Sequence, residues 1–361
     1  MNGAAEVAGS APSGLLKSRL DRVDVLVVNY NAGDWLVRTV QSIRPQGADE
    51  PNLIVVDNGS SDDSLQRLFE MADPHPNPPP HAGEDFGDGD QSAPPPRADK
   101  DQSPPRSQRV QKNLPPPPAG EGRGGGEDSN ITVDRAGRNL GFAAGINRAA
   151  GQAKREFLLL LNPDCLIDPD TLARLVDELD NHPEAALVSG KVLDMHGREQ
   201  RGSRRRLPTP SRIVNEMLPL GGEGLDTTDT PAPNTAIEVE AVSGACMLVR
   251  RSAFLELDGM DEAYPLHFED LDLFARLAES GRTLRWVPDA RIVHAGGRSS
   301  SHRPVAVLWA KHRGLWRYLG RHCNVESWPR WQRPLWLLAL VAHAAVRTPL
   351  VWAASRLRAA K

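Results

Sequence analysis

The sequence has few cysteines and no apolar leader. Cys165, Cys246 and Cys323 lie far apart in 361 residues and form no CxxC pair. This spacing excludes a disulfide framework and a cysteine-based zinc site, and it is typical of reduced, cytosolic thiols. The first 22 residues contain no apolar stretch of the kind found in a signal peptide, so we expect none.

The chain also lacks a strong excess of charge of either sign. Charged residues make up 25% of it and the formal net charge is −4. So small a net charge gives no reason to expect a nucleic acid as partner. Hydrophobic residues make up 39%, which is enough for a sizeable core and excludes collagen-like and wholly disordered classes.

Glycine-rich loops for binding phosphates are missing as well. The first apolar stretch, residues 23–28, is followed by Asn29-Tyr30-Asn31-Ala32-Gly33 and not by GxGxxG. The sequence contains no Walker lysine loop either. These two absences exclude the dinucleotide-binding Rossmann motif and the P-loop.

Proline, by contrast, is concentrated in one segment. Fourteen of the 31 prolines lie between Asp73 and Asn130, in a stretch with almost no large apolar residues. Such a stretch cannot bury enough surface to offset the entropy of ordering. We therefore expect residues 73–129 to be a disordered low-complexity insertion in a surface loop, with a polyproline ligand for a partner as the alternative. Residues 1–22 are expected to be a flexible N-terminus.

Outside this segment, strand and helix patterns alternate. Uninterrupted apolar runs predict strands at residues 23–28, 53–56, 131–133 and 157–161. Apolar residues at helical spacing predict helices over 35–43, 65–69 and 172–179. The alternation predicts an α/β domain over 23–72 and 130–300, with a mostly parallel sheet and ligands at the carboxyl ends of its strands.

The last sixty residues have a different composition. Residues 303–361 contain eleven lysines and arginines but one acid, Glu326, and six of the eight tryptophans. This composition suits an anionic membrane surface, so we expect residues 301–361 to form a basic, Trp-rich helical tail lying there. Arg347 and Pro349 interrupt the apolar run before it reaches the ~20 residues of a membrane span. The alternative is a helical subdomain that packs on the core.

Two acidic sites follow predicted strands. Asp57 comes after residues 53–56, where a carboxylate could accept from a nucleotide base or a ribose. A turn with Ser61 as a helix N-cap would explain the same residues. Asp164 comes after residues 157–161 and directly after a proline, which suits a divalent cation with oxygen ligands. The alternative there is an Asx-Pro turn.

A third acidic site is Glu269-Asp270-Leu271-Asp272. Asp270 shares a helical face with Leu273 and Leu277, so we expect its carboxylate to be partly desolvated, with a raised pKa. Such a group can take a proton from a hydroxyl. Glu269 and Asp272 fall on other faces and are expected to be ordinary acids of a first helical turn.

Seven stretches together resemble the family-2 inverting glycosyltransferases of the GT-A fold, most closely their bacterial rhamnosyltransferase-like branch. In chain order they are 27–31 (VVNYN), 55–60 (VVDNGS), 138–147 (RNLGFAAGIN), 160–164 (LLNPD), 242–251 (VSGACMLVRR), 269–272 (EDLD) and 293–294 (VH). The resemblance covers about residues 23–300 apart from the insertion. It implies a Rossmann-like, mostly parallel mixed sheet flanked by helices.

The resemblance also implies a role for each matching residue. Residues expected to contact the nucleotide sugar are Asn29 and Tyr30 beside the base, Asp57 on the base or ribose, Arg138, Asn139 and Asn147 in the donor pocket, and Asn162 near the ribose. Asp164 is expected to hold Mg²⁺ or Mn²⁺ on the diphosphate, with His294 as a further contact. Asp270 is expected to be the catalytic base, paired with Glu269.

The implied reaction moves a sugar with inversion from a nucleotide-sugar donor to a hydroxyl of a glycan or lipid-linked acceptor, in cell-surface polysaccharide synthesis. L-Rhamnose from dTDP-L-rhamnose is the expected donor, at the cytoplasmic face of the inner membrane. Arg201 and residues 204–206 could hold a lipid diphosphate or be a solvated basic loop. The alternatives are a UDP-hexose donor and an inactive sugar-nucleotide-binding protein. Where the family has Asp-Gly-Ser, this chain has Asp62-Asp63-Ser64, so a strained position with positive φ is expected.

Overall fold

A computed structural model describes residues 19–43, 51–72, 130–218, 221–264, 266–296, 304–324 and 328–359. The insertion expected at 73–129 and residues 1–18 lie outside the described residues. Residues 19–22, which we had assigned to a flexible N-terminus, pack on the domain. Leu20 is buried, and Arg22 pairs with Asp180 at 2.7 Å and with Glu156 at 2.8 Å. The ordered domain therefore begins before the first strand.

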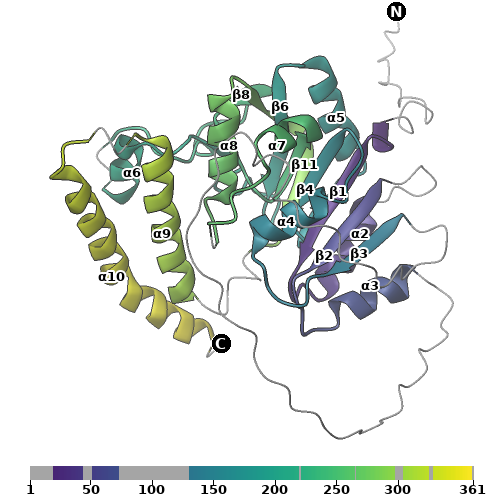
Figure 1. Ribbon diagram of the computed structural model, residues 1–361, viewed down its shortest axis with the longest axis horizontal. Helices are drawn as coiled ribbons and strands as arrows, with labels where there is room; N and C mark the ends of the chain where they lie inside the picture. Colours follow the sequence, from purple (N-terminus) through teal and green to yellow (C-terminus); the bar gives the residue numbers. More distant parts are fainter. Residues whose placement is uncertain are drawn as a thin grey trace, which may run out of the picture.

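The central element is a mixed sheet with the order β3-β2-β1-β4-β10-β6-β11-β5, and β8 pairs with β11 (Figure 1). Its strands are β1 (Val23–Asn29), β2 (Asn52–Asp57), β3 (Ile131–Arg135), β4 (Phe157–Leu161), β5 (Cys165–Ile167), β6 (Ala185–Leu193), β8 (Ile237–Val239), β10 (Cys246–Arg250) and β11 (Thr283–His294). The strands from β3 to β4 are parallel, whereas β10 runs antiparallel to both of its neighbours. A separate pair consists of β7 (Arg204–Arg205) and β9 (Ala241–Val242). The carboxyl ends of β1, β2 and β4 therefore meet at one edge, as expected.

Helices cover both faces of the sheet, which explains the uninterrupted apolar strands. One face carries α2 (Asp34–Ile43), α3 (Ser64–Ala72) and α5 (Thr171–Asn181). The other face carries α4 (Phe142–Ala150), α7 (Arg251–Glu256) and α8 (Glu269–Glu279). Successive residues of β1 alternate between these two layers: Val25 and Val27 join the first core, and Leu26 and Val28 the second. The predicted α/β fold is confirmed, with strands at 23–28, 53–56, 131–133 and 157–161 and helices over 35–43, 65–69 and 172–179.

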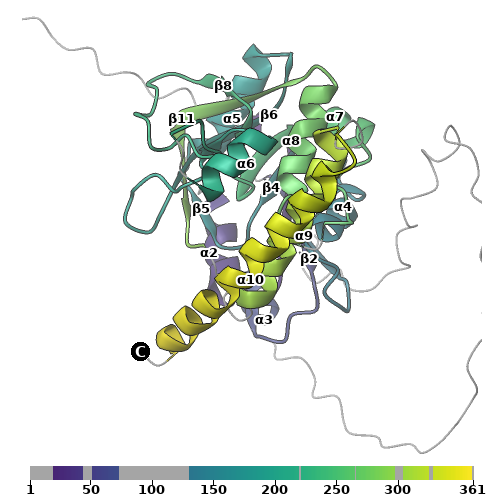
Figure 2. The ribbon, with the colours of Figure 1, turned by 90° about the vertical axis from the view of Figure 1, so that its left-hand side faces the viewer.

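The C-terminal tail is helical, as expected, and its first helix is part of the core. It consists of α9 (Pro304–His322) and α10 (Gln332–Ala359), on the side of the molecule away from α2 and α3 (Figures 1 and 2). Tyr318 of α9 is 1% exposed and belongs to the core under α8. Gly314 allows α9 to approach the turn before α8 closely, because a Cβ there would lie 3.1 Å from the Phe268 ring.

The second tail helix, α10, is the outermost element on this side. It packs against α9 and α6 (Pro210–Met217) through Leu340, in a small cluster with Ile213 and Leu319. The helix continues through Arg347 and Pro349, where we had expected the apolar run to end. Its segment Gln332–Arg356 is long and apolar enough to cross a membrane, and little of it is buried in the protein.

Asp272 joins α8 to α9 inside the core. It is fully buried and accepts hydrogen bonds from Nε of Arg276 at 2.7 Å and from the Tyr264 hydroxyl at 3.2 Å. Nε2 of His322, on α9, lies 2.9 Å from the same carboxylate. A buried carboxylate with several donors holds these segments in one arrangement, because the charge is stable only where the donors surround it.

We predict that Asp272→Asn lowers the free energy of unfolding by about 3–5 kcal/mol, because it leaves the buried Arg276 without its counter-charge. Thermal unfolding of the full chain measures the loss. Glu279→Gln is the matched control, since Glu279 also pairs with His322 but its side chain is 58% exposed. If the two substitutions lower the melting temperature equally, Asp272 does not have this structural role.

Candidate active site

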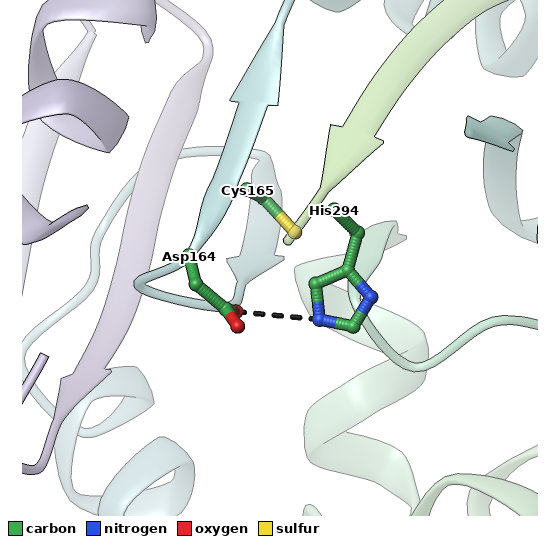
Figure 3. Close-up of side chains that lie close together, drawn as sticks. All are labelled: Asp164, Cys165 and His294. Atoms are coloured by element: carbon green, nitrogen blue, oxygen red, sulfur yellow. Dashed lines mark ion pairs between the residues drawn. The ribbon is translucent and has the colours of Figure 1, made fainter. Parts of the chain in front are cut away.

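A carboxylate and an imidazole meet where β5 pairs with the end of β11. In this antiparallel pair Cys165 lies opposite His294, and Asp164 directly precedes β5. Oδ1 of Asp164 lies 3.3 Å from Nε2 of His294 (Figure 3). The ligand atoms of Asp164, Cys165 and His294 all lie within 4.8 Å of one another. Residues 130 positions apart are thus brought together by strand pairing.

Gln200 determines which nitrogen of His294 faces Asp164. Its Nε2 donates to the His294 carbonyl at 2.7 Å, and its Oε1 lies 3.0 Å from Nδ1 of the ring. Because an amide oxygen only accepts, this arrangement places the ring proton on Nδ1 and leaves a lone pair on Nε2. An imidazole held in this way is suited to bind a metal through Nε2. Our sequence analysis missed Gln200, which has no local motif.

The donor set fits a divalent cation that takes most of its ligands from a substrate. Asp164 supplies oxygen and His294 supplies nitrogen, a combination that suits Mn²⁺ or Mg²⁺ with open positions. Cys165 is not a third ligand, because its Sγ donates to the Ala245 carbonyl at 3.4 Å. Burial raises the pKa of the Cys165 thiol well above its usual range, which keeps it protonated.

Asp57 sits at the end of β2 on a network of buried polar groups. Its Oδ1 accepts from Nδ2 of Asn29 at 2.9 Å, and its Oδ2 accepts from the Ser60 N–H at 3.2 Å. The same Asn29 amide donates to the Ser64 hydroxyl at 2.9 Å. Asn29 is fully buried. We had expected its side chain to border a nucleotide base, but it lies beneath Asp57 and positions that carboxylate.

Arg138 and Asn139 lie at the rim beside Asp57, where both are exposed. Gly59 brings their turn close to the end of β2, because a Cβ on Gly59 would lie 3.0 Å from Cα of Arg138. Tyr30 is half-buried at the end of β1. The turn that carries Arg138 and Asn139 therefore lies at the same end of the sheet as Asp57 and Tyr30.

The strain expected at Asp62-Asp63-Ser64 is absent. Neither aspartate has a positive φ; instead Asn31 has φ 53° and Gly59 has φ 73°. Asp62 closes the turn by accepting from the Gly33 N–H at 2.8 Å and from the Ser64 hydroxyl at 2.6 Å. The left-handed positions thus fall on an asparagine and a glycine, which adopt them at little cost.

Asn147 and Asn162 have different surroundings. Both polar atoms of the Asn147 amide bind the backbone of Met260, at 2.8 Å each, and its Nδ2 also donates to Glu262 at 2.9 Å. We had expected Asn147 to line a donor pocket, but it joins α4 to the loop before α8. Asn162 is half-buried at the end of β4, and its N–H donates to the Ala245 carbonyl at 2.9 Å.

Asp270 lies in the first turn of α8, beside the turn that enters β10. Its Oδ1 accepts from the Leu271 N–H at 2.8 Å, and its Oδ2 accepts from Nη2 of Arg205 at 2.6 Å. A Cβ on Gly244 would lie 2.9 Å from the same Oδ2. The next residue, Ala245, provides the carbonyl that binds Cys165 and Asn162. Asp270 and the residues on both sides of Asp164 in sequence therefore all contact this turn.

The acidic residues beside Asp270 are more buried than the helical-face argument predicted. Glu269 is 8% and Asp272 0% exposed, whereas the Asp270 side chain is 17% exposed. The prediction was wrong because α9 and the turn before α8 cover those faces. Burial, together with the nearby charge of Asp270, raises the pKa of Glu269 to about 8. At neutral pH Glu269 is thus protonated, and it lies beside the ion pair that Asp270 forms with Arg205.

The arginine cluster is a solvated basic loop only at Arg201, whose side chain is 70% exposed. Arg204 is 3% exposed, pairs with Glu199 at 2.9 Å and lies over the Trp286 ring. Arg201 pairs with Glu216, and Arg206 lies 3.6 Å from Glu223. Arg205 pairs with Asp270. Each of the four arginines therefore has an acidic partner, and one partner is the candidate base.

We predict that Glu269→Gln flattens the pH dependence of stability. The folded-state pKa of Glu269 lies above its unfolded value of 4.5, so its stabilising contribution is full below pH 4.5 and is lost by about pH 8. The melting temperature of the variant should therefore rise relative to wild type between pH 5 and pH 8. Glu256→Gln, with a side chain 58% exposed, is the control. A constant difference between the variant and wild type over this range would contradict the assignment.

Comparison with known proteins identifies the family. Residues 125–314, more than half of the chain, match the family described as "Glycosyltransferase like family 2", and residues 24–80 match "Glycosyl transferase family 2". The N-acetylglucosaminyl-diphospho-decaprenol L-rhamnosyltransferase of Mycobacterium tuberculosis is 30% identical over 252 residues, which are 61% of this chain and 77% of that protein. A rhamnosyltransferase of Escherichia coli K12 is 29% identical over 177 residues, 47% of this chain and 63% of that one.

Among solved structures, a mannosyltransferase from Pyrobaculum calidifontis in complex with GDP-Man and Mn²⁺ is similar at 17% identity and a TM-score of 0.49. It is matched over 94% of this chain and 75% of that chain. The mixed sheet with helices on both faces is the GT-A architecture that the sequence resemblance implied. By its family match and its relatives, the chain belongs to glycosyltransferase family 2, in the rhamnosyltransferase-like branch, and is a glycosyltransferase.

Proposed function

We propose that the protein transfers L-rhamnose from dTDP-L-rhamnose, with inversion, to a hydroxyl of a lipid-linked acceptor in cell-surface polysaccharide synthesis. Two relatives with rhamnosyltransferase names support the sugar, and the name of one of them includes a diphospho-decaprenol acceptor. The observation that carries the proposal is the position of the Asp164–His294 pair and Asp270 around residues 243–245. Metal binding and base catalysis can then act on one bound donor.

The donor would be held by two groups of residues. Asp57, with Tyr30, Arg138 and Asn139 around it, would bind the nucleoside. Asp164 and His294 would hold Mg²⁺ or Mn²⁺, which when bound neutralises charge that develops on the diphosphate. Gln200 keeps Nε2 of His294 free for this contact.

Asp270 would act as the general base. As the acceptor oxygen forms its bond to the anomeric carbon, the hydroxyl proton passes to a carboxylate oxygen of Asp270. The bond between the anomeric carbon and the diphosphate oxygen breaks, and its electron pair leaves with the nucleoside diphosphate. One displacement inverts the anomeric centre without a protein nucleophile. Glu269 is neutral at pH 7, so it adds no second negative charge beside the base.

We predict that Asp270→Asn lowers the rate of sugar transfer by about 10²–10⁴-fold, which is what a general base contributes. Donor binding should persist, because Asp270 lies outside the groups that hold the donor. Nucleoside diphosphate release with Mn²⁺ measures the rate, and the thermal shift with dTDP-L-rhamnose measures binding.

Asp168→Asn is the matched control, because Asp168 is exposed and lies beyond β5. Equal rates in wild type and Asp270→Asn would instead indicate a sugar-nucleotide-binding protein without turnover. A larger thermal shift with a UDP-hexose than with dTDP-L-rhamnose would show that the donor is a UDP-hexose. The proposed mechanism would be unchanged.

We also propose that the tail binds the cytoplasmic face of the inner membrane. Nine of the eleven large apolar residues that are exposed among the described residues lie on α9, α10 or the turn before α10: Trp309, Trp331, Leu335, Leu337, Leu338, Val341, Val346, Leu350 and Trp352. Exposed cations lie among them, including Arg347 and Arg356, which stacks on Trp352. Because α10 packs along α6 and α9, the proposal is a helix lying in the interface and not one crossing it.

We predict that the protein sediments with anionic vesicles at low salt and is released at high salt. Leu338→Glu and Leu350→Glu together should weaken sedimentation by about tenfold or more, since each inserted leucine contributes about 1.5–3 kcal/mol. Met195→Glu, also at an exposed position but outside the tail, is the control. Sedimentation that resists high salt would indicate insertion. Equal binding by all variants would show that the tail is not the contact.

A further inference from the structure

Both oxygens of the candidate base are already engaged. Oδ1 of Asp270 accepts from its own helix at the Leu271 N–H, and Oδ2 holds the Arg205 guanidinium at 2.6 Å. Gly244 packs against Oδ2 from another side. A Cβ at this position would lie 2.9 Å from Oδ2, so a larger residue would not fit. An acceptor hydroxyl therefore has to compete with a charge-assisted hydrogen bond for the atom that would receive its proton.

The position of Arg205 is set by its backbone and by one carbonyl. Its strand, β7, pairs with β9, and its Nε donates to the Val242 carbonyl at 3.0 Å. Gly202, with φ 86°, lies under the side chain, where a Cβ would lie 3.3 Å from Cδ of Arg205. Unlike the neighbouring Arg204, whose side chain is 4% exposed, the Arg205 side chain is 23% exposed. Arg205 can thus be reached by a ligand, whereas Arg204 cannot.

Two titratable groups at the start of α8, His267 and Glu269, carry no charge at neutral pH, while Lys311 of α9 lies near His267. Burial raises the pKa of Glu269 to about 8, and burial lowers the pKa of His267 to about 4. The charge of Asp270 is therefore balanced by Arg205 and not by its immediate chain neighbours. An anion that draws the guanidinium away would leave Asp270 as a free carboxylate.

We propose that Arg205 holds Asp270 in an unproductive ion pair until an acceptor diphosphate binds, and that the guanidinium then moves to this diphosphate and frees Oδ2. The inference rests on the proposed function and deepens it. A guanidinium matches phosphate oxygens as well as it matches a carboxylate, so the exchange replaces one charged pair with another. The acceptor shifts the equilibrium because only one of the two states offers it this contact.

The consequence of this arrangement is protection of the donor. Without an acceptor, water could form the bond to the anomeric carbon, pass its proton to Asp270, and release the nucleoside diphosphate with the electron pair of the broken bond. While Arg205 holds Oδ2, that proton has to compete with the guanidinium for this oxygen, so hydrolysis is slow. Transfer is favoured over hydrolysis because the base is released only when the acceptor is present.

The first test is Arg205→Gln in the full chain with Mn²⁺ and dTDP-L-rhamnose. Donor hydrolysis without acceptor should rise by about tenfold or more, since a released base contributes within the 10²–10⁴ range. The double variant Arg205→Gln/Asp270→Asn should lose this gain. The control is Arg174→Gln, which should hydrolyse the donor at the wild-type rate. Arg174 is an exposed residue of α5 that pairs with Asp170. An Arg205→Gln variant that binds donor but hydrolyses it no faster than wild type overturns the inference.

The second test uses the wild-type protein and needs no substitution. Farnesyl diphosphate carries the anionic group of a lipid-linked acceptor but no sugar hydroxyl, so it can displace Arg205 without accepting the sugar. It should accelerate donor hydrolysis by wild type, whereas farnesol should not. If hydrolysis is unchanged by farnesyl diphosphate, Arg205 is not responsive to the acceptor. If the wild-type protein does not release nucleoside diphosphate from any donor, with or without an acceptor, the proposed function itself is wrong.

Discussion

The antiparallel placement of β10 between β4 and β6 brings the reactive groups together. Because β10 runs against β4, its first residue, Cys246, lies opposite Leu161 at the carboxyl end of that strand. The turn at residues 243–245 therefore stands at the same edge as Asp164. A parallel strand in this place would have carried that turn to the far edge of the sheet. The candidate metal pair and the candidate base meet as a result of one strand direction.

Much of the fold could be predicted from the sequence because its signals are local. The apolar runs at residues 23–28 and 157–161 mark strands buried on both faces, and helical spacing marks the helices between them. Asp164 could be chosen from its place after a strand and a proline, and His294 from its place after a strand-like run. Their contact could not be predicted, since it depends on the pairing of β5 with β11. Nothing in the residues near either position predicts that register.

The errors in the predicted site have a common physical cause. A polar residue at the end of a strand can contact a ligand, or it can support the residue that does. Asn147 belongs to the second kind, because both polar atoms of its amide bind the backbone of Met260. Asn29 supports Asp57 through Nδ2, while its buried Oδ1 has no partner among the described residues. The helical-face argument failed at Asp272 because His322 reaches that carboxylate from fifty residues later in the chain. Gln200 carries no motif, and its role appears only in the contacts it makes. Arg205 was expected to be one of several arginines that could hold a lipid diphosphate, but its contact with Asp270 appears only in the structure.

The position of α9 changes where the catalytic unit ends. We had placed the end of the domain at residue 300, yet Tyr318 fills the core beneath α8, and His322 binds Asp272. Two cations of this helix, Arg317 and Arg321, pair with Asp261 in the loop before α8. Part of the basic charge of the tail therefore stabilises the fold and does not bind lipid. A chain cut ahead of α9 would leave one side of α8, the helix of the candidate base, uncovered. The folded unit therefore extends at least to His322.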